Sequence, residues 1–249
     1  MDQFKNKQES HNHSLRILDI LKLYDSVLDS VTVVADMGCG AGLDIKWFAE
    51  AETRDVPPIP YDYVCYAVDK DLSKLPKKMP KNVHPIEGDF SERLLPRKAD
   101  ILWSHDSLQY SLNPLQTLKT WNESMSLNGM LILTVPQYSG YQYNRHVTRA
   151  YDGVYYSFNV CNLIYMLAVN GFDCKDAYFL KEKNDPWIHA VVYKSDIPPM
   201  DPAATRWYDL MEAGLLNDSA VKSINEHGYL RQEDLISPWI DRNFYFVQD

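Results

Sequence analysis

The stretch "VVADMGCGAG" at residues 33–42 runs from apolar residues into a turn that holds three glycines in five positions. The residues after it, GLDIKWFAEAE, place Ile45 and Phe48 on one side of a predicted helix. Glycines permit a tight turn and close approach of the backbone, and a helix N-terminus offers free N–H groups. A buried strand, a glycine turn and a helix therefore predict a loop against which a ligand lies.

Composition limits the class of protein. The chain has 249 residues, of which 45% are hydrophobic and 12% aromatic, enough to bury a core. Its net charge of −9 disfavours a protein that grips nucleic-acid phosphates. The four cysteines are scattered without a C-x-x-C pair, so neither a metal site nor a disulfide scaffold is expected. The polar N-terminus and the absence of a long apolar run predict no membrane segment and a cytoplasmic location.

The rest of the pattern alternates strands with helices. Further strands are expected over residues 61–69, 83–90, 99–104 and 130–136, and a helix from Pro114 is expected to close at Asn128-Gly129. Two last strands, 172–181 and 186–194, read as a hairpin. This predicts an α/β, Rossmann-like, doubly wound and mostly parallel seven-stranded sheet, with an antiparallel C-terminal hairpin and helices on both faces.

Three segments are expected. An amphipathic helix over residues 14–29 occupies segment 1–30, the α/β core spans 31–195, and a helical C-terminal extension spans 196–249 after a proline-rich linker. The extension could cover a substrate site, mediate dimerisation or pack against the sheet.

Acidic residues follow successive strands. Asp36 precedes the glycine turn, where it would repel a pyrophosphate, and Leu43 stands where a dinucleotide fingerprint has its third glycine. Asp69 ends the second strand, where an acid can accept hydrogen bonds from both ribose hydroxyls. After the third strand, Asp89 can accept from an adenine amine, while Phe90 offers an apolar surface. The acids together favour a nucleoside ligand that carries an ammonium group.

Over residues 31–193 the ordered motifs VVADMGCGAG, YAVDKD, IEGDF, ILWSHDSLQY and LNGMLILTVP resemble the class I S-adenosylmethionine-dependent methyltransferases. The resemblance implies S-adenosylmethionine as cofactor, and that Asp36 places its amino group, Asp69 its ribose, and Asp89 with Phe90 its adenine. It also implies that the N-terminal helix closes over the cofactor. The full cofactor-binding set that we expect is Asp36, Gly38, Cys39, Gly40, Gly42, Asp69, Lys70, Asp89, Phe90 and Ser104.

The acceptor side is less constrained. His105 follows the fourth strand and is a candidate general base, or it only shapes the pocket; Asp106 could orient it or cap the next turn. Tyr138 and His146 lie in a tyrosine-rich loop that either covers the acceptor or is an ordinary surface loop. In that loop Arg145 and Arg149 could hold a carboxylate or phosphate.

The nucleic-acid branches of this family are disfavoured, because the fourth strand leads into SHDSLQY instead of an Asn/Asp-Pro-Pro-aromatic motif and the chain has no Pro-Cys dipeptide. We therefore expect methyl transfer to a small molecule or a peptide, by a monomer or homodimer. Three alternatives stay open: an aminopropyltransferase, a non-catalytic cofactor-binding partner domain, and an NAD-dependent oxidoreductase. Leu43 and Asp36 disfavour the last.

Overall fold

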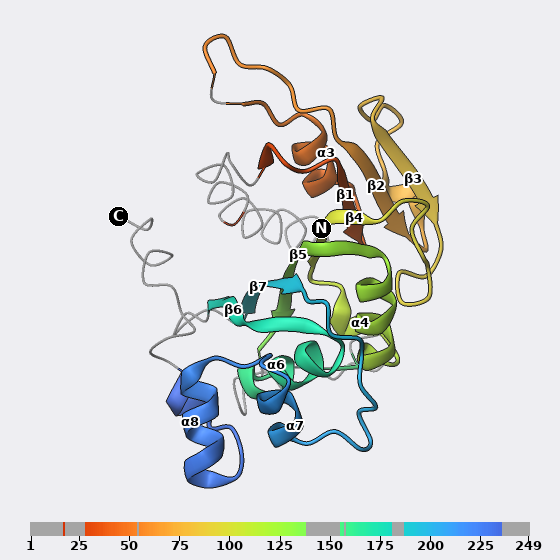
Figure 1. Cartoon of the computed structure of the whole chain (residues 1–249). Helices are drawn as coiled ribbons and strands as arrows, with labels where there is room; N and C mark the ends of the chain where they lie inside the picture. The colour runs from red at the N-terminus through yellow and green to blue at the C-terminus, as the bar shows by residue number, and fades with distance from the viewer. Residues whose placement is uncertain are drawn as a thin grey trace.

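Figure 1 shows the computed structural model of the chain, which describes residue 17 and residues 28–53, 55–137, 155, 156, 158–180 and 187–235. A seven-stranded sheet runs through its centre in the order β3-β2-β1-β4-β5-β7-β6. The strands are β1 (Val33–Met37), β2 (Val64–Asp69), β3 (Val83–Glu87), β4 (Ala99–His105), β5 (Met125–Pro136), β6 (Phe172–Leu180) and β7 (Trp187–Lys194).

The pairing of these strands fixes where a ligand can bind. Strands β1 to β5 pair in parallel, and β7 runs antiparallel to both β5 and β6. The strand order reverses between β1 and β4, which creates the switch point at which ligands bind in such sheets, outside the carboxyl ends of the strands. The predicted mostly parallel sheet with an antiparallel hairpin is confirmed.

Helices cover both faces of the sheet, as predicted. The described helices are α3 (Leu43–Ala49), α4 (Pro114–Glu123), α6 (Val160–Val169), α7 (Trp207–Glu212) and α8 (Asp218–His227), with 3-10 turns η1 (Leu72–Lys74), η2 (Leu108–Tyr110) and η4 (Gln232–Leu235). Helix α3 packs on one face, and α4 and α6 pack on the other (Figure 1). The two faces consequently have separate hydrophobic clusters.

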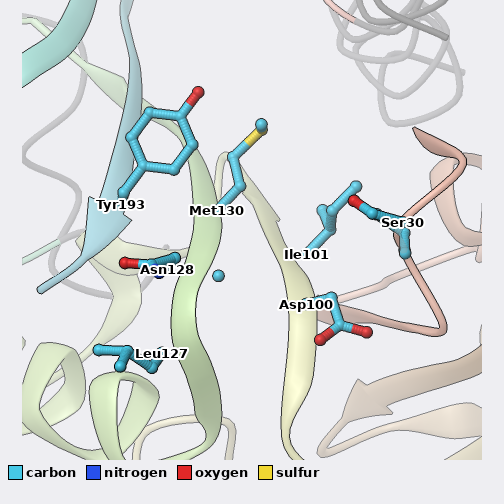
Figure 2. A pocket seen from close by; sticks show the side chains of 9 residues that line it. Ser30, Asp100, Ile101, Leu127, Asn128, Met130 and Tyr193 are labelled. Carbon is cyan, nitrogen blue, oxygen red and sulfur yellow. The ribbon is translucent and has the colours of Figure 1, made fainter. Parts of the chain in front are cut away.

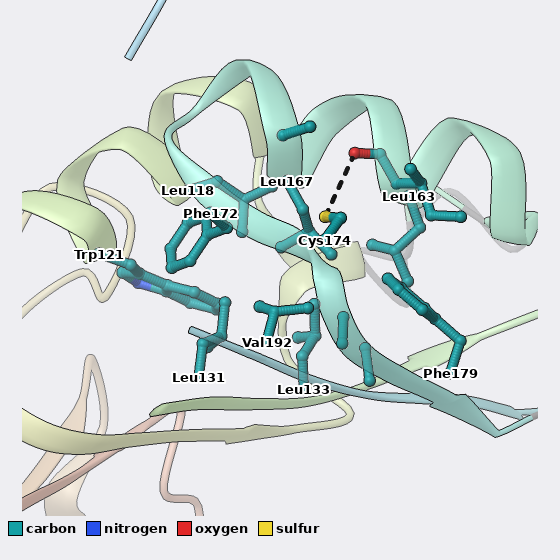
Figure 3. Close-up of a cluster of buried hydrophobic side chains, with 14 of the residues drawn as sticks. Leu118, Trp121, Leu131, Leu133, Leu163, Leu167, Phe172, Cys174, Phe179 and Val192 are labelled. Carbon is teal, nitrogen blue, oxygen red and sulfur yellow. Dashed lines mark hydrogen bonds between the residues drawn. The ribbon is translucent and has the colours of Figure 1, made fainter. Parts of the chain in front are cut away.

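The larger cluster lies between the sheet and helices α4 and α6 (Figure 3). Phe172 and Trp121 fill it together with leucines from β5 and α6, and all of these side chains are almost fully buried. Cys174 belongs to the same cluster, and its thiol lies 3.9 Å from the carbonyl oxygen of Ile164. Burial raises the pKa of this thiol, so Cys174 serves packing and not reactivity.

One predicted boundary is wrong. The helix from Pro114 ends at Glu123, and Asn128 and Gly129 lie within β5 instead of closing the helix. At this point the register between β4 and β5 shifts, and Asn128 adopts a left-handed conformation with φ 60°. A Cβ on Gly129 would lie 2.8 Å from the carbonyl oxygen of Ser126 and 3.0 Å from that of Ala99, so glycine serves strand packing here.

The C-terminal residues extend the same core. Leu210, Leu215 and Ile224 from the α7–α8 region are buried in the larger cluster. The hydroxyl of Tyr165 on α6 donates toward the carbonyl oxygens of Pro202 and Thr205, each at 3.0 Å. At the other end of the chain, Ile17 and Leu28 belong to the cluster on the α3 face. Apart from these two residues and Asp29, the predicted helix 14–29 lies outside the described residues.

Candidate cofactor and acceptor site

The glycine loop is fixed by the end of the neighbouring strand. The amide groups of Gly38 and Cys39 donate to the carbonyl oxygen of Val68 at 2.8 and 3.0 Å. The amide of Gly40 donates to Oδ2 of Asp69 at 2.8 Å, and Oδ1 of Asp69 accepts from the amide of Asp71 at 3.0 Å. Two positions predicted to bind the cofactor, Gly40 and Asp69, are thus in direct contact.

The three glycines of the loop all have positive φ but different surroundings. A Cβ on Gly38 would lie 2.3 Å from Oγ of Ser107, and one on Gly42 would lie 2.6 Å from a methyl group of Leu75. A Cβ on Gly40 would meet no atom within 4 Å. Gly38 and Gly42 therefore have packing reasons to lack a side chain, whereas the space beside Gly40 is open to a ligand.

Acidic side chains gather behind this loop. Asp36 is only 3% exposed, and its pKa is raised well above the ordinary value by burial and by the nearby Asp44 and Asp69 carboxylates. Asp44, in the first turn of α3, accepts a hydrogen bond from the indole of Trp103 at 3.0 Å. Sequence reasoning missed Asp44, although its place at a helix N-terminus was visible. A cation beside the loop would relieve the repulsion among these acids.

Of the two residues predicted to contact adenine, only Phe90 lies against the glycine loop. Phe90 is half-buried with its ring 6.0 Å from that of Trp121, and its Cδ1 would lie 3.6 Å from a Cβ on Gly38. Asp89 is exposed, and its carboxylate accepts from the amide and hydroxyl of Ser91 at 2.9 and 2.6 Å. Phe90 therefore borders the glycine loop, whereas Asp89 holds the turn that follows β3.

The remaining predicted cofactor positions differ in accessibility. Lys70 is exposed at the end of β2, while Cys39 is buried and the pKa of its thiol is raised by desolvation and by Asp36 and Asp69. Ser104 is fully buried in β4, and its hydroxyl has no hydrogen-bond partner among the described residues. An unsatisfied buried hydroxyl costs stability, so Ser104 is poised to bond a group from outside the chain.

Of the three predicted catalytic residues, His105 is the one that the structure describes. His105 is buried; its ring stacks on Trp103 with an interplanar angle of 11° and lies 6.3 Å from Trp187. This aromatic setting on the α3 face suits a packing role for His105. Tyr138 and His146, with Arg145 and Arg149, lie outside the described residues.

The segment that follows β4 contacts the glycine loop through Ser107. The hydroxyl of Ser107 lies 3.3 Å from the carbonyl oxygen of Gly38 and 3.1 Å from that of His105. The side-chain amide of Gln109 donates to Oδ1 of Asp106. Neither Ser107 nor Gln109 was predicted from the sequence, because the contact of Ser107 with Gly38 depends on strand pairing and that of Gln109 with Asp106 on the turn after β4. The sequence predicts that Asp106 either orients His105 or caps the next turn; in the structure its carboxyl group accepts from Gln109, and Ser107 is the N-cap residue of η2.

A cavity of about 250 Å³ lies at the opposite edge of the sheet (Figure 2). It is lined by residues from the starts of β4 and β5 and the end of β7, among them Ile101, Gly129 and Tyr193. Asp100 borders it, but its carboxylate accepts from the amides of Thr32 and Val33 at 2.9 and 3.0 Å, and the pKa of Asp100 is lowered by hydrogen bonds that outweigh desolvation. The cavity is thus separate from the glycine loop.

The described residues contain neither a cluster of metal ligands nor a membrane-spanning helix. No group of three or more His, Cys, Asp or Glu side chains is placed to hold a metal ion in the parts of the chain that the structure describes. Within the same parts, every helix is too short or too polar to cross a bilayer.

No family model and no curated protein matches the sequence. Solved structures do match. A Galdieria sulphuraria protein provisionally named a sarcosine dimethylglycine methyltransferase superposes with a TM-score of 0.54 at 10% identity, over 75% of this chain and 86% of its own. A provisionally named S-adenosylmethionine-dependent methyltransferase from Listeria monocytogenes gives 0.50 at 16% identity, over 66% and 92%. The chain has the class I methyltransferase fold.

A third solved structure of similar fold contains two proteins in complex. A structure of the Haloferax volcanii Trm112 methyltransferase activator in complex with a provisionally named methyltransferase gives a TM-score of 0.51 at 12% identity, over 70% of this chain and 89% of the matched chain. Identities of this size establish the shared fold and leave the reaction to be argued from the site.

Proposed function

We propose that this protein is an S-adenosylmethionine-dependent methyltransferase that acts on a small molecule or a peptide group. The observation that carries the proposal is the buried carboxylate of Asp36 behind an open glycine loop. Asp44 and Asp69 disfavour its ionised form, and a ligand with an ammonium and a sulfonium group supplies the compensating positive charge. A pyrophosphate would add negative charge at the same place, which disfavours a dinucleotide.

The proposed cofactor placement follows from the loop. The methionine part of the cofactor would lie beside Gly40, where the space is open. The hydroxyl of Ser104 would form a hydrogen bond with it. The carboxylate of Asp69, already fixed by Gly40 and Asp71, would accept from the ribose hydroxyls. Bound there, S-adenosylmethionine supplies an electrophilic methyl group. The chain contributes alignment and exclusion of water, which suffices for an in-line displacement.

The proposal extends to the roles of the segments, the oligomeric state and the location of the protein. Segments 1–30, 31–195 and 196–249 are proposed as a cofactor-covering helix, the catalytic core and an extension. We infer a monomer or homodimer in the cytoplasm, without nucleic acid as substrate. The free cysteines Cys39, Cys65, Cys161 and Cys174 of the described residues support a reducing compartment.

Calorimetric titration with S-adenosylmethionine and with S-adenosylhomocysteine tests the proposal. We expect both to bind, and Asp69→Ala to weaken binding at least about tenfold, equivalent to about 1.4 kcal/mol. Asp62→Ala, which removes an exposed acid before β2, is the charge-matched control. No binding to the wild-type protein would rule out both the enzyme and a non-catalytic cofactor-binding domain.

Transfer of label separates the remaining alternatives. Incubation with methyl-labelled S-adenosylmethionine and fractionated extract should label a small-molecule or peptide fraction. Binding without transfer would favour the non-catalytic partner domain. Transfer of an aminopropyl group from decarboxylated S-adenosylmethionine, with release of methylthioadenosine and no methyl transfer, would favour an aminopropyltransferase.

A further inference from the structure

The loop between α3 and β2 projects from the body of the molecule (Figure 1). Five consecutive apolar residues in it, Val56-Pro57-Pro58-Ile59-Pro60, are all exposed, and the exposed fraction reaches 97% for Val56 and 57% for Ile59. None of the five belongs to either hydrophobic cluster. An exposed apolar run of this length is expected in a folded protein only where it has a function.

Hydrogen bonds brace this loop at its base. The amide of Thr53 donates to the carbonyl oxygen of Ile59 at 2.8 Å, and the amide of Ile59 donates to Oγ1 of Thr53 at 3.1 Å. The amide of Tyr61 donates to the carbonyl oxygen of Ala51 at 3.0 Å. A partner would therefore meet a preorganised surface, and docking would cost little conformational entropy.

The prolines restrict the backbone of the loop tip. A proline ring fixes φ at about −65°, and a residue that precedes proline is biased toward extended backbone. Pro57 precedes Pro58, and Ile59 precedes Pro60, so residues 57–60 favour the polyproline II conformation. Because that helix has roughly three residues per turn, the rings of Pro57 and Pro60 should lie on one edge of it.

Residues 57–60 offer hydrogen-bond acceptors but no free backbone donor. Proline has no N–H, and the remaining amide, that of Ile59, is already bonded to Thr53. Addition to the edge of a sheet uses amide donors from both strands, so this mode of docking is disfavoured. Proline rings and carbonyl oxygens match a groove lined by tryptophan and tyrosine, whose rings pack on proline while their N–H and O–H groups donate.

The charge around the tip restricts the partner further. Asp55 next to the prolines, and Glu52 and Asp62 at the base of the loop, are exposed acids. Residues 50–62 contain four acidic residues and one arginine, so the segment is negatively charged. A groove with Lys or Arg on its rim would complement this charge, which favours encounter and selects among partners.

We propose that residues 56–60 dock into the aromatic-lined groove of a partner protein that recognises polyproline II segments and carries Lys or Arg beside that groove. The loop leads into the amino end of β2, whereas the glycine loop follows the carboxyl end of the parallel strand β1. A partner held by the proline loop therefore leaves the glycine loop accessible. The inference is independent of the proposed methyl transfer and assigns this loop the recruitment of another protein.

Calorimetric titration of the full chain with isolated SH3, WW and EVH1 domains, each chosen with Lys or Arg beside its groove, tests the proposal. We expect the wild-type protein to bind one or more of them. A double variant, Pro57→Ala with Pro60→Ala, should bind at least about tenfold more weakly, because it loses two rings and the preset backbone. Pro96→Ala, which removes an exposed proline outside the loop, is the control and should bind as the wild-type protein does.

A competition experiment on the wild-type protein does not depend on the folding of any variant. An excess of a linear proline-rich peptide occupies the groove of the domain and should displace the wild-type protein from it. Thermal unfolding of the double variant and of Pro96→Ala checks that both are folded in the titrations.

Each contrary result overturns the proposal. These results are the absence of binding to all three kinds of domain, equal affinity of the double variant and Pro96→Ala, and a complex that the peptide does not displace. Sedimentation of the protein alone tests a second copy as the occupant. A wild-type dimer that the double variant converts to a monomer would assign the loop to self-association instead. None of these measurements uses S-adenosylmethionine, so their failure is distinct from failure of the proposed methyl transfer.

Discussion

The cluster beneath α6 and the loops at the carboxyl ends of β1, β2 and β4 are built on opposite principles. The cluster needs no ligand, since Phe172, Trp121 and their neighbours are buried against one another (Figure 3). These loops differ, since Asp36 is buried, Asp106 is half-buried, and the pKa values of both carboxyl groups are raised by desolvation. The first region stabilises the fold, and the second gives up stability that a cationic ligand can restore.

Truncation in the cluster should have the largest effect on stability. Phe172→Ala removes a fully buried ring and leaves a cavity, so the free energy of unfolding should fall by about 3–5 kcal/mol. Leu112→Ala, at a side chain that is 75% exposed, is the control and should change it by less than about 0.5 kcal/mol. Urea denaturation measures both. Similar losses for the two variants would contradict the assigned packing.

The glycine loop should divide into a packing position and a ligand position. Gly38→Ala forces Ser107 to move as well as straining the backbone, and should cost about 2 kcal/mol of unfolding free energy. Gly40→Ala meets no atom and should cost about 1 kcal/mol from its positive φ alone.

The two variants should differ again in cofactor affinity, measured by calorimetry. Gly40→Ala fills the open space beside the Asp69 carboxylate, so S-adenosylhomocysteine should bind at least several-fold more weakly than to the wild-type protein. Full affinity in this variant would mean that the cofactor does not approach the loop at Gly40.

Asp36→Asn should separate stability from binding. The folded-state pKa of Asp36 lies above its unfolded value, so the folded protein holds more protons and its stability decreases as pH rises above about 4. Removing the titrating carboxyl should raise the unfolding free energy of the ligand-free protein at pH 8. The same variant should bind S-adenosylmethionine more weakly.

Asp106 adds to the same trend. Its pKa of about 7 should produce a further loss of stability between pH 4 and 7 that Asp106→Asn abolishes. Thermal unfolding across this pH range, with the double variant as reference, measures both contributions. The same pH dependence of stability in the wild-type protein and in both single variants would contradict the raised pKa values of these two groups.

Much of the fold was predictable because each element carries its own periodic signal. The apolar strand, the glycine turn and the helix after it are local features, and local sequence determines them. The end of the helix from Pro114 was not predictable, because Asn128-Gly129 is a stop signal in most contexts. Here the close approach of Ala99 on β4 requires glycine inside a strand instead.

The sequence by itself determined the strands, the order of strands and helices, and the places of the acids at the strand ends. Only the tertiary structure decided which of the predicted site residues lie in contact. It joined Gly40 to Asp69, brought the His105 ring close to Trp103 and Trp187, and paired Asp106 with Gln109. The physical reason is that burial and charge proximity depend on which strands become neighbours. A carboxyl group acquires its pKa from residues that are distant in the chain.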